Sequence, residues 1–379
     1  MSWGINGNNS ITSNAAVGVM DNANYSLGGT SVNGFAPTTI DNENLGWEKT
    51  HSWNLGLDMG FFRNRIVLAL DLYNKTTEDL LYQVSVPAIM GFSKAWGNIG
   101  NLNNKGFEIE LTTQNLTGRL KWTTSLNLFY NRNEVVSLGE DNNTVFIGYG
   151  NTQMYKVGEP LRAYYMYDAV GVYQRQEDLE KYPTMENSVV GDVRYRDANG
   201  DGIINDDDRT LVGKPTPDLT FGFRNMFKYK NLDFSILLTG QTGGKIYGVL
   251  GRAMDRPGMG ASINMLACWK NMWISEEQPG DGKTPGIKNS NTGALYDSRW
   301  LYSSDYIKIK NITIGYRIPV RKGLIKNARL YLSADNLWMW DKYKGGFSPE
   351  ANQGGKKGDY DYGSYPQARI IAIGANVTF

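Results

Sequence analysis

The chain has 379 residues, and its 39 Lys and Arg residues balance 38 Asp and Glu residues at a formal net charge of +1. This balance argues against a nucleic-acid partner, because proteins that bind phosphate backbones carry a basic excess. One cysteine and one histidine leave little material for a disulfide, a zinc site or a catalytic triad. No apolar run approaches the ~20 residues of a membrane-spanning helix, and the many Gly, Tyr and Trp residues favour an all-β chain.

Alternating apolar and polar residues predict the first strands. Within residues 51–60, Trp53, Leu55 and Leu57 alternate with polar or small residues, and residues 66–73 repeat the pattern. A period of two gives a strand one apolar and one polar face. Residues 61–65 between them have the length of a hairpin connection, so two antiparallel neighbours are expected.

A longer strand is predicted from Leu120 to Tyr130, where every second residue contributes to one face. About ten residues suffice to cross a bilayer when a strand is tilted, although a long strand of a soluble sandwich shows the same pattern. About a dozen such segments occur along the chain. Between Tyr306 and Tyr316 the apolar positions change from odd to even at Asn311, which predicts a β-bulge.

The connections fall into two sizes, as in outer-membrane barrels with short turns at one end and long loops at the other. Residues 61–65 are short, whereas residues 240–305 contain only one helical candidate, at 263–273, among Gly, Pro, Asn and Ser. A loop of this length in a compact domain is usually functional. Its Trp269 and Trp273 are candidates for contact with a partner.

The carboxy-terminal residues also alternate, with Ile371, Ile373, Ala375 and Val377 leading to a terminal Phe379. A closing strand that ends in an aromatic residue resembles the assembly signal of bacterial outer-membrane barrels, where pairing of the last strand removes the sheet edges. The alternative is a buried last strand of a soluble sandwich.

One acidic loop, DANGDGIINDDD, has the spacing of a calcium-binding loop. Its hard oxygen ligands would be Asp197, Asn199, Asp201, Asp208 and the carbonyl of Ile203. Aspartate replaces the usual bidentate glutamate at the last position, and the flanks predict strands rather than helices, so weak binding is expected. The alternative is a hydrated acidic turn whose carboxylates pair with Arg194, Arg196 or Arg209.

Aromatic residues form a second group of candidates, because Tyr and Trp stack on sugar rings and also form the interfacial girdles of membrane barrels. Trp338 and Trp340 end a predicted strand and favour the girdle interpretation. Tyr164, Tyr165 and Tyr167 favour structural packing in the lumen or at the rim, with substrate contact as the alternative.

Four motifs together resemble the SusC/RagA family of TonB-dependent outer-membrane transporters of Bacteroidetes. They are WGINGNN with NGFAPTTIDNENLGWEKT (3–9 and 33–50), GDVRYRDANGDGIINDDDRTLVGKPTPDLTFGF (191–223), SDYIKIKNITIGYRIP (304–319) and YPQARIIAIGANVTF (365–379). They occur in the order of the family and span nearly the whole chain.

The resemblance implies an antiparallel transmembrane β-barrel portion with long extracellular loops. Residues 1–379 would be the carboxy-terminal part, with about a dozen strands of a barrel of about 22. Family members carry a signal peptide, a TonB-contacting segment and a plug before the barrel. None of these is recognised here, so a fragment is expected.

The function implied by the resemblance is import of oligosaccharides or oligopeptides across the outer membrane, together with a SusD-like lipoprotein. Energy would come from the TonB complex through the amino-terminal part of the protein, and the outer surface of the barrel would contact outer-membrane lipid. No cofactor is required, calcium is the only metal suggested, and no catalytic residues or enzymatic activity are expected. The alternatives are a soluble carbohydrate-binding or adhesin β-sandwich and a glycosidase, for which no carboxylate pair can be chosen.

Overall fold

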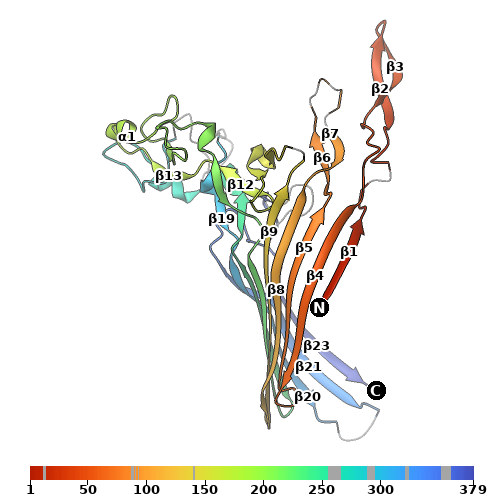
Figure 1. Ribbon diagram of the computed structural model, residues 1–379. Helices are drawn as coiled ribbons and strands as arrows, with labels where there is room; N and C mark the ends of the chain where they lie inside the picture. The colour runs from red at the N-terminus through yellow and green to blue at the C-terminus, as the bar shows by residue number, and fades with distance from the viewer. Residues whose placement is uncertain are drawn as a thin grey trace.

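The computed structural model describes residues 1–11, 14–86, 89, 91–92, 94–139, 141–254, 266–287, 295–320, 324–350 and 360–379. Its main element is one long, curved antiparallel sheet, and the long connections between strands gather at one end of it (Figure 1). Within the described residues, the helices are too short or too polar to cross a membrane.

Among the described residues, ten strands form this sheet, which we call the wall, where about a dozen were expected. They follow the order β1-β4-β5-β8-β9-β16-β17-β20-β21-β23, with every neighbouring pair antiparallel. Their bounds are β1 Ser2–Asn8, β4 Glu48–Phe61, β5 Ile66–Glu78, β8 Asn101–Thr117, β9 Leu120–Ser137, β16 Leu219–Tyr229, β17 Leu232–Thr242, β20 Tyr306–Ile318, β21 Asn327–Asp341 and β23 Ile370–Thr378.

The register places apolar residues on one face of the wall and polar residues on the other. One row across eight strands consists of Met59, Leu68, Leu111, Leu126, Phe223, Leu238, Ile309 and Trp338. The neighbouring row on the opposite face begins with Asp58, Ala69, Glu110 and Asn127. Ile371 pairs through β21, β20, β17 and β16 with Thr124, so it shares the face of Leu126.

The apolar face is free of charged residues over the full length of β16. This strand has 11 residues, and they pair with Leu120–Tyr130 of β9. At about 3.3 Å per residue the uncharged band measures about 36 Å along the strands, or about 28 Å in height at a 40° tilt. This height matches the ~25 Å apolar band of transmembrane barrels.

The connections alternate between short turns at one end of the wall and long loops at the other. The turns are residues 62–65, 118–119, 230–231 and 319–326, and the loops are 9–47, 79–100, 138–218, 243–305 and 342–369. In the first turn, Phe62, Arg63 and Asn64 all have positive φ, of 54°, 59° and 63°, which reverses the chain tightly. The predicted hairpin at 61–65 is therefore confirmed.

The predicted β-bulge is also confirmed, with Lys310 as the extra residue. Against β17, the register shifts between Ile309 and Asn311 because β20 has one residue more. Against β21, the register shifts at the same place because β21 has one residue more. Because of the inserted Lys310, Ile309 and Ile312 face the same side despite their odd and even positions. The Lys310 ammonium donates to the side-chain oxygen of Asn336, 3.3 Å away on β21, where the chain has a positive φ of 53°.

The long loops contain their own secondary structure, which the alternation pattern did not predict. Two hairpins, β2–β3 and β6–β7, rise beyond the wall (Figure 1). Their bounds, with those of the remaining elements, are β2 Met20–Leu27, β3 Thr30–Pro37, β6 Leu81–Ser85, β7 Lys94–Asn98, β10 Val145–Ile147, β11 Gln153–Tyr155, β12 Ala163–Met166, β13 Ala169–Val172, α1 Gln176–Lys181, β14 Val193–Tyr195, β15 Thr210–Gly213, β18 Lys245–Gly248, α2 Val249–Met254, β19 Leu301–Ser303 and β22 Tyr360–Asp361.

The helical candidate at 263–273 is only partly confirmed. Residues 263–265 lie outside the described part of the chain, and Ala267–Asn271 form a 3-10 turn. The expected 240–305 loop also contains β18, α2 and β19. Hydrophobic periodicity does not predict these elements, because each is too short to show a repeating pattern.

Candidate functional site

Three loops far apart in the sequence pack together into one body at the loop end of the wall, which we call the outer body. Its core consists of Tyr164, Met166, Tyr247, Trp300 and Tyr360, all essentially buried. β18 and β22 pair in parallel through Tyr247 and Tyr360, so the 243–305 and 342–369 loops share one small sheet. The tyrosine side chains therefore build a scaffold that holds the surrounding loops in place.

A buried carboxylate stabilises the same body. Asp297 is fully buried and accepts hydrogen bonds from the Arg299 guanidinium at 2.8 Å and from the Tyr195 hydroxyl at 2.8 Å. Burial raises the pKa of Tyr195 well above its ordinary value, so its hydroxyl stays protonated and donates. The Arg299 guanidinium also lies over the Trp300 ring at 4.2 Å. Sequence reasoning missed this network, because isolated Asp, Arg and Tyr residues carry no local signal.

A second carboxylate fixes the last loop. Asp361 is buried and accepts from the Tyr343 hydroxyl at 2.6 Å and from the backbone N–H groups of Gly363 and Ser364 at 2.8 and 2.9 Å. Burial raises the pKa of Tyr343 above its ordinary value, and the hydrogen bond to Asp361 raises it further. Tyr343 is therefore a structural donor.

The acidic loop is a series of tight turns. The Asp197 carboxylate accepts from the backbone N–H groups of Gly200 and Gly202 at 2.6 and 3.0 Å, and Asp201 accepts from that of Ile203 at 2.9 Å. Partial desolvation opposes ionisation of Asp197, but the hydrogen bonds from Gly202 and Gly200 win and lower its pKa. The Asn199 side-chain oxygen accepts from the Asp201 backbone N–H at 3.0 Å.

The end of the loop is anchored in the outer body. Asp208 is fully buried, and its two oxygens accept from the backbone N–H groups of Ala198 and Asn205, both at 2.8 Å. Ile204 packs in a small core with Tyr167, while Ile203 stays exposed. Asp208 thus ties the two ends of the loop together, which is the position that a bidentate ligand occupies in calcium loops.

The five predicted calcium ligands therefore lie in one compact loop. Their donor set of carboxylate, amide and carbonyl oxygens fits a hard cation. Among the described residues, no three His, Cys, Asp or Glu side chains form a group with the geometry of a metal site. Arg196 pairs with Asp168 instead of the loop, at 2.9 Å, and Arg209 donates to the carbonyl of Tyr165 at 3.1 Å. The calcium site stays a prediction.

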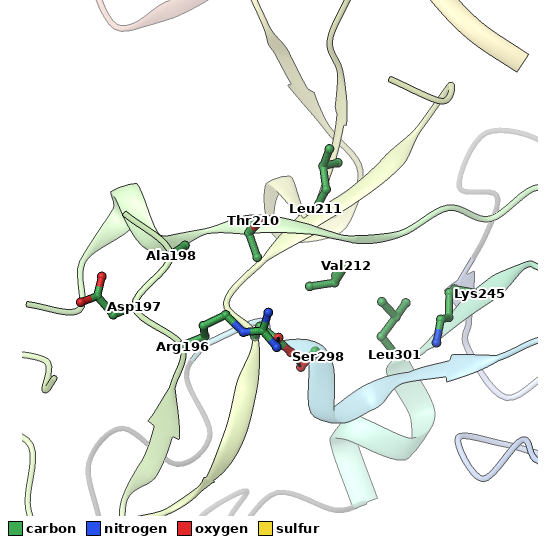
Figure 2. Close-up of a pocket in the computed structure, with 10 residues that line it drawn as sticks. Arg196, Asp197, Ala198, Thr210, Leu211, Val212, Lys245, Ser298 and Leu301 are labelled. Carbon is green, nitrogen blue, oxygen red and sulfur yellow. Dashed lines mark hydrogen bonds and ion pairs between the residues drawn. The ribbon is translucent and has the colours of Figure 1, made fainter. Parts of the chain in front are cut away.

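A polar pocket of about 540 Å³ lies beside this loop, between β15, β18 and the turn before β19. Figure 2 shows Arg196 and Ser298 on one side and Lys245, Val212 and Leu301 on the other. The Ser298 hydroxyl donates to the Asp168 carboxylate at 2.9 Å, next to the Arg196 ion pair. The hydroxyl, ammonium and guanidinium groups that line this pocket suit hydrogen bonding to a polar ligand.

Comparison with known proteins identifies the family. The family model described as "TonB dependent receptor-like, beta-barrel" matches residues 6–337. The chain belongs to this family. TonB-dependent receptor P26 of Formosa agariphila is 34% identical over 393 residues, which cover 100% of this chain and 39% of that protein. TonB-dependent receptor SusC of Bacteroides thetaiotaomicron is 29% identical over 402 residues, covering 100% of this chain and 37% of the relative.

A solved structure described as the RagAB peptide transporter shares the fold, with a TM-score of 0.86 at 24% identity, covering 100% of this chain and 40% of that chain. The chain thus spans about two fifths of the length of the relatives it matches. The predicted resemblance to the SusC/RagA family and the location in the outer membrane are confirmed. The soluble sandwich does not fit this fold.

In transmembrane β-barrels, the apolar outer face contacts lipid and carries girdles of aromatic residues at its edges. Trp338 and Trp340 lie on the apolar face of the wall, more than half exposed, with their rings 6.4 Å apart. This position favours the girdle interpretation over a sugar platform. Asn225 places a polar side chain within the band, and its side-chain oxygen accepts from the Trp122 indole at 2.8 Å and from the Thr124 hydroxyl at 2.7 Å. Its carbonyl is therefore satisfied in lipid.

Other aromatic candidates of the TonB-dependent receptor chain are part of the outer body. Tyr164 and Tyr167 are buried, as the packing interpretation requires, and the half-buried Tyr165 lies beneath the Arg209 guanidinium at 5.0 Å. Trp269 is 5% exposed, and the Trp273 indole donates to the carbonyl of Gln174 at 3.0 Å. These two tryptophans consequently offer a partner less surface than the sequence suggested.

Proposed function

We propose that this chain forms wall and outer loops of an active outer-membrane importer of the SusC/RagA type. The observation that carries the proposal is the uncharged apolar band on one face of the wall, opposite a polar face that suits a water-filled lumen. Membership of the TonB-dependent receptor family and the named relatives SusC and RagAB support it.

The cargo that we propose is an oligosaccharide or an oligopeptide. The structural relative is described as a peptide transporter, which supports the oligopeptide. The oligosaccharide follows from the resemblance to the SusC/RagA family in the sequence. The polar pocket beside Ser298 and Lys245, in the outer body, has a volume in the range of small-ligand sites. A SusD-like lipoprotein would contact the loop end, and the TonB complex would supply energy at the opposite end.

Uptake by living cells tests this function. A strain that lacks the full-length gene is complemented with the wild-type gene, and uptake of fluorescent oligosaccharides and oligopeptides is measured with and without tonB. We expect uptake of one cargo class only in complemented cells with an intact tonB gene. Equal uptake in the deletion strain for every cargo would contradict the proposal.

A further inference from the structure

The polar face of the wall carries a strongly basic pocket beside the short turns, which we call the basic pocket. It has a volume of about 570 Å³ and is lined by seven Lys and Arg side chains against a single carboxylate. Arg119 and Lys230 come from the turns, and Lys121, Arg224 and Lys228 come from β9 and β16. The net charge of the whole chain is only +1, so this concentration of positive charge is local.

The register explains why these cations share one face. Lys121 and Lys228 are direct partners between β9 and β16, and Asp233 of β17 continues the same row. Arg317 and Arg329 are partners between β20 and β21, two residues nearer the turns and therefore on the same face as the first row. Side chains of one row point to the same face of a sheet, so all five project from the polar face.

Among the described residues, one of the seven cations, Arg329, forms an ion pair with the carboxylate of the pocket. The Asp233 carboxylate accepts two hydrogen bonds from Arg329, at 2.9 and 2.5 Å. Gly315 is the direct partner of Asp233 on β20, the strand that separates Asp233 from Arg329. A Cβ at Gly315 would meet the Arg329 guanidinium. Within the described part of the chain, Lys121, Arg224 and the other four cations have no carboxylate partner within 4.0 Å.

We propose that the basic pocket binds a short oligomer that carries several carboxylate or sulfate groups. Guanidinium forks bind such planar or tetrahedral oxyanions through paired hydrogen bonds, and ammonium groups add point charges. The cations come from four strands and two turns and span the width of β9 to β21, at about 4.8 Å per strand. This spacing matches an oligomer better than a single inorganic ion. This inference deepens the proposed function, on which it rests, because it makes the imported molecule anionic.

The β4–β8 part of the polar face is acidic, which strengthens the selectivity of the basic pocket for anions. Asp71 of β5 and Glu108 of β8 are direct partners, and the next row on the same face, two residues away, contains Asp58 and Glu110. These four carboxylates repel an anion from the β4–β8 part of the wall. An anionic molecule in the lumen is therefore drawn toward β9–β21 and toward the short turns, which form the end opposite the outer body.

Calorimetric titration of the purified full-length transporter tests the proposal. The probes are trigalacturonate, a triglutamate peptide and the neutral maltotriose, each at low and high salt. We expect binding of one or both anionic probes, weakened at high salt because the contacts are ionic, and the comparison between them distinguishes a sugar from a peptide source. The double variant Arg224→Gln/Arg317→Gln should weaken that binding at least tenfold.

A matched control is Lys105→Gln/Arg132→Gln, which removes two exposed cations paired on the opposite face of β8 and β9. It should leave anion binding unchanged. Equal binding of maltotriose and the anions, or unchanged affinity in Arg224→Gln/Arg317→Gln, overturns the proposal. Absence of anion binding together with a lower melting temperature of that variant also overturns it, because the pocket would then hold an acidic surface of the protein itself. Import of neutral cargo that depends on TonB would leave the proposed function intact.

Discussion

A buried ion pair stabilises the outer body. Asp297 is completely buried, whereas the Arg299 side chain is 15% exposed. Replacing Asp297 with Asn leaves the arginine without its counter-charge and should cost the local fold about 3–5 kcal/mol. We expect Asp297→Asn to accelerate protease cleavage of the outer loops in intact cells at least 100-fold, while the membrane-embedded barrel keeps its heat-modifiable migration.

The exposed Asp207, replaced by Asn, is the control for that variant, because it changes a charge in the same body without breaking a buried pair. Unchanged protease sensitivity in Asp297→Asn would show that the Tyr195, Arg299 and Asp297 contacts do not stabilise the loops.

Calcium binding by the acidic loop is a second prediction for single residues. Because Asp208 replaces the usual glutamate, we expect a Kd of roughly 10⁻⁴ to 10⁻³ M. Asp201→Ala should lower the melting temperature of the loops only when calcium is present. Asp207→Ala, which removes a charge of the same loop outside the predicted ligand set, should not. A titration without calcium-dependent heat, with Asp201→Ala matching wild type in calcium and in chelator, would leave the hydrated acidic turn.

Among the strands, β20 shows how one inserted residue determines which face is apolar. Lys310 interrupts the alternation, so that Ile312 and Ile314 join Ile307 and Ile309 on the lipid-facing side. Deleting Lys310 would turn either half of the strand to the wrong face. We therefore predict that the deletion abolishes accumulation of the full-length barrel in the outer membrane, measured by surface labelling.

The substitution Lys310→Ala is the matched control, because it keeps the inserted residue and removes only the ammonium group and its bond to Asn336. It should accumulate normally. Normal surface labelling of the deletion variant would mean that the wall tolerates the shift and that the bulge does not fix the register.

How far the sequence predicts each element depends on the range of its contacts. The alternation at Leu120–Tyr130 and the change of phase at Asn311 are local patterns, and they predicted the strand and the bulge. The pairing of Tyr195 with Asp297 joins residues 102 positions apart. No local pattern records such a contact, so the outer body could not be predicted. The acidic loop at 197–208 could be singled out from the sequence because its residues lie within one short segment, and its calcium binding stays a prediction.

For the whole molecule, the central consequence of the fold is its position in the bilayer. Leu126 lies in the middle of the uncharged band, Leu120 at its turn end, and Asn127 on the polar face. The cost of an arginine on the lipid face depends on depth, at about 2–4 kcal/mol near the midplane and about 0–1 kcal/mol near the interfaces. Arginine at these three positions therefore reports both the face and the depth of β9.

We predict that Leu126→Arg strongly reduces the folded, heat-modifiable barrel in the outer membrane, that Leu120→Arg reduces it slightly and that Asn127→Arg leaves it unchanged. All three variants add the same side chain to the same strand, so differences in β-propensity are small beside the transfer cost into lipid. Folding into lipid vesicles during urea titration measures each cost. Equal stabilities of Leu126→Arg and Asn127→Arg would contradict the lipid-facing assignment. Equal losses of stability in Leu120→Arg and Leu126→Arg would instead indicate that the bilayer centre lies nearer the short turns.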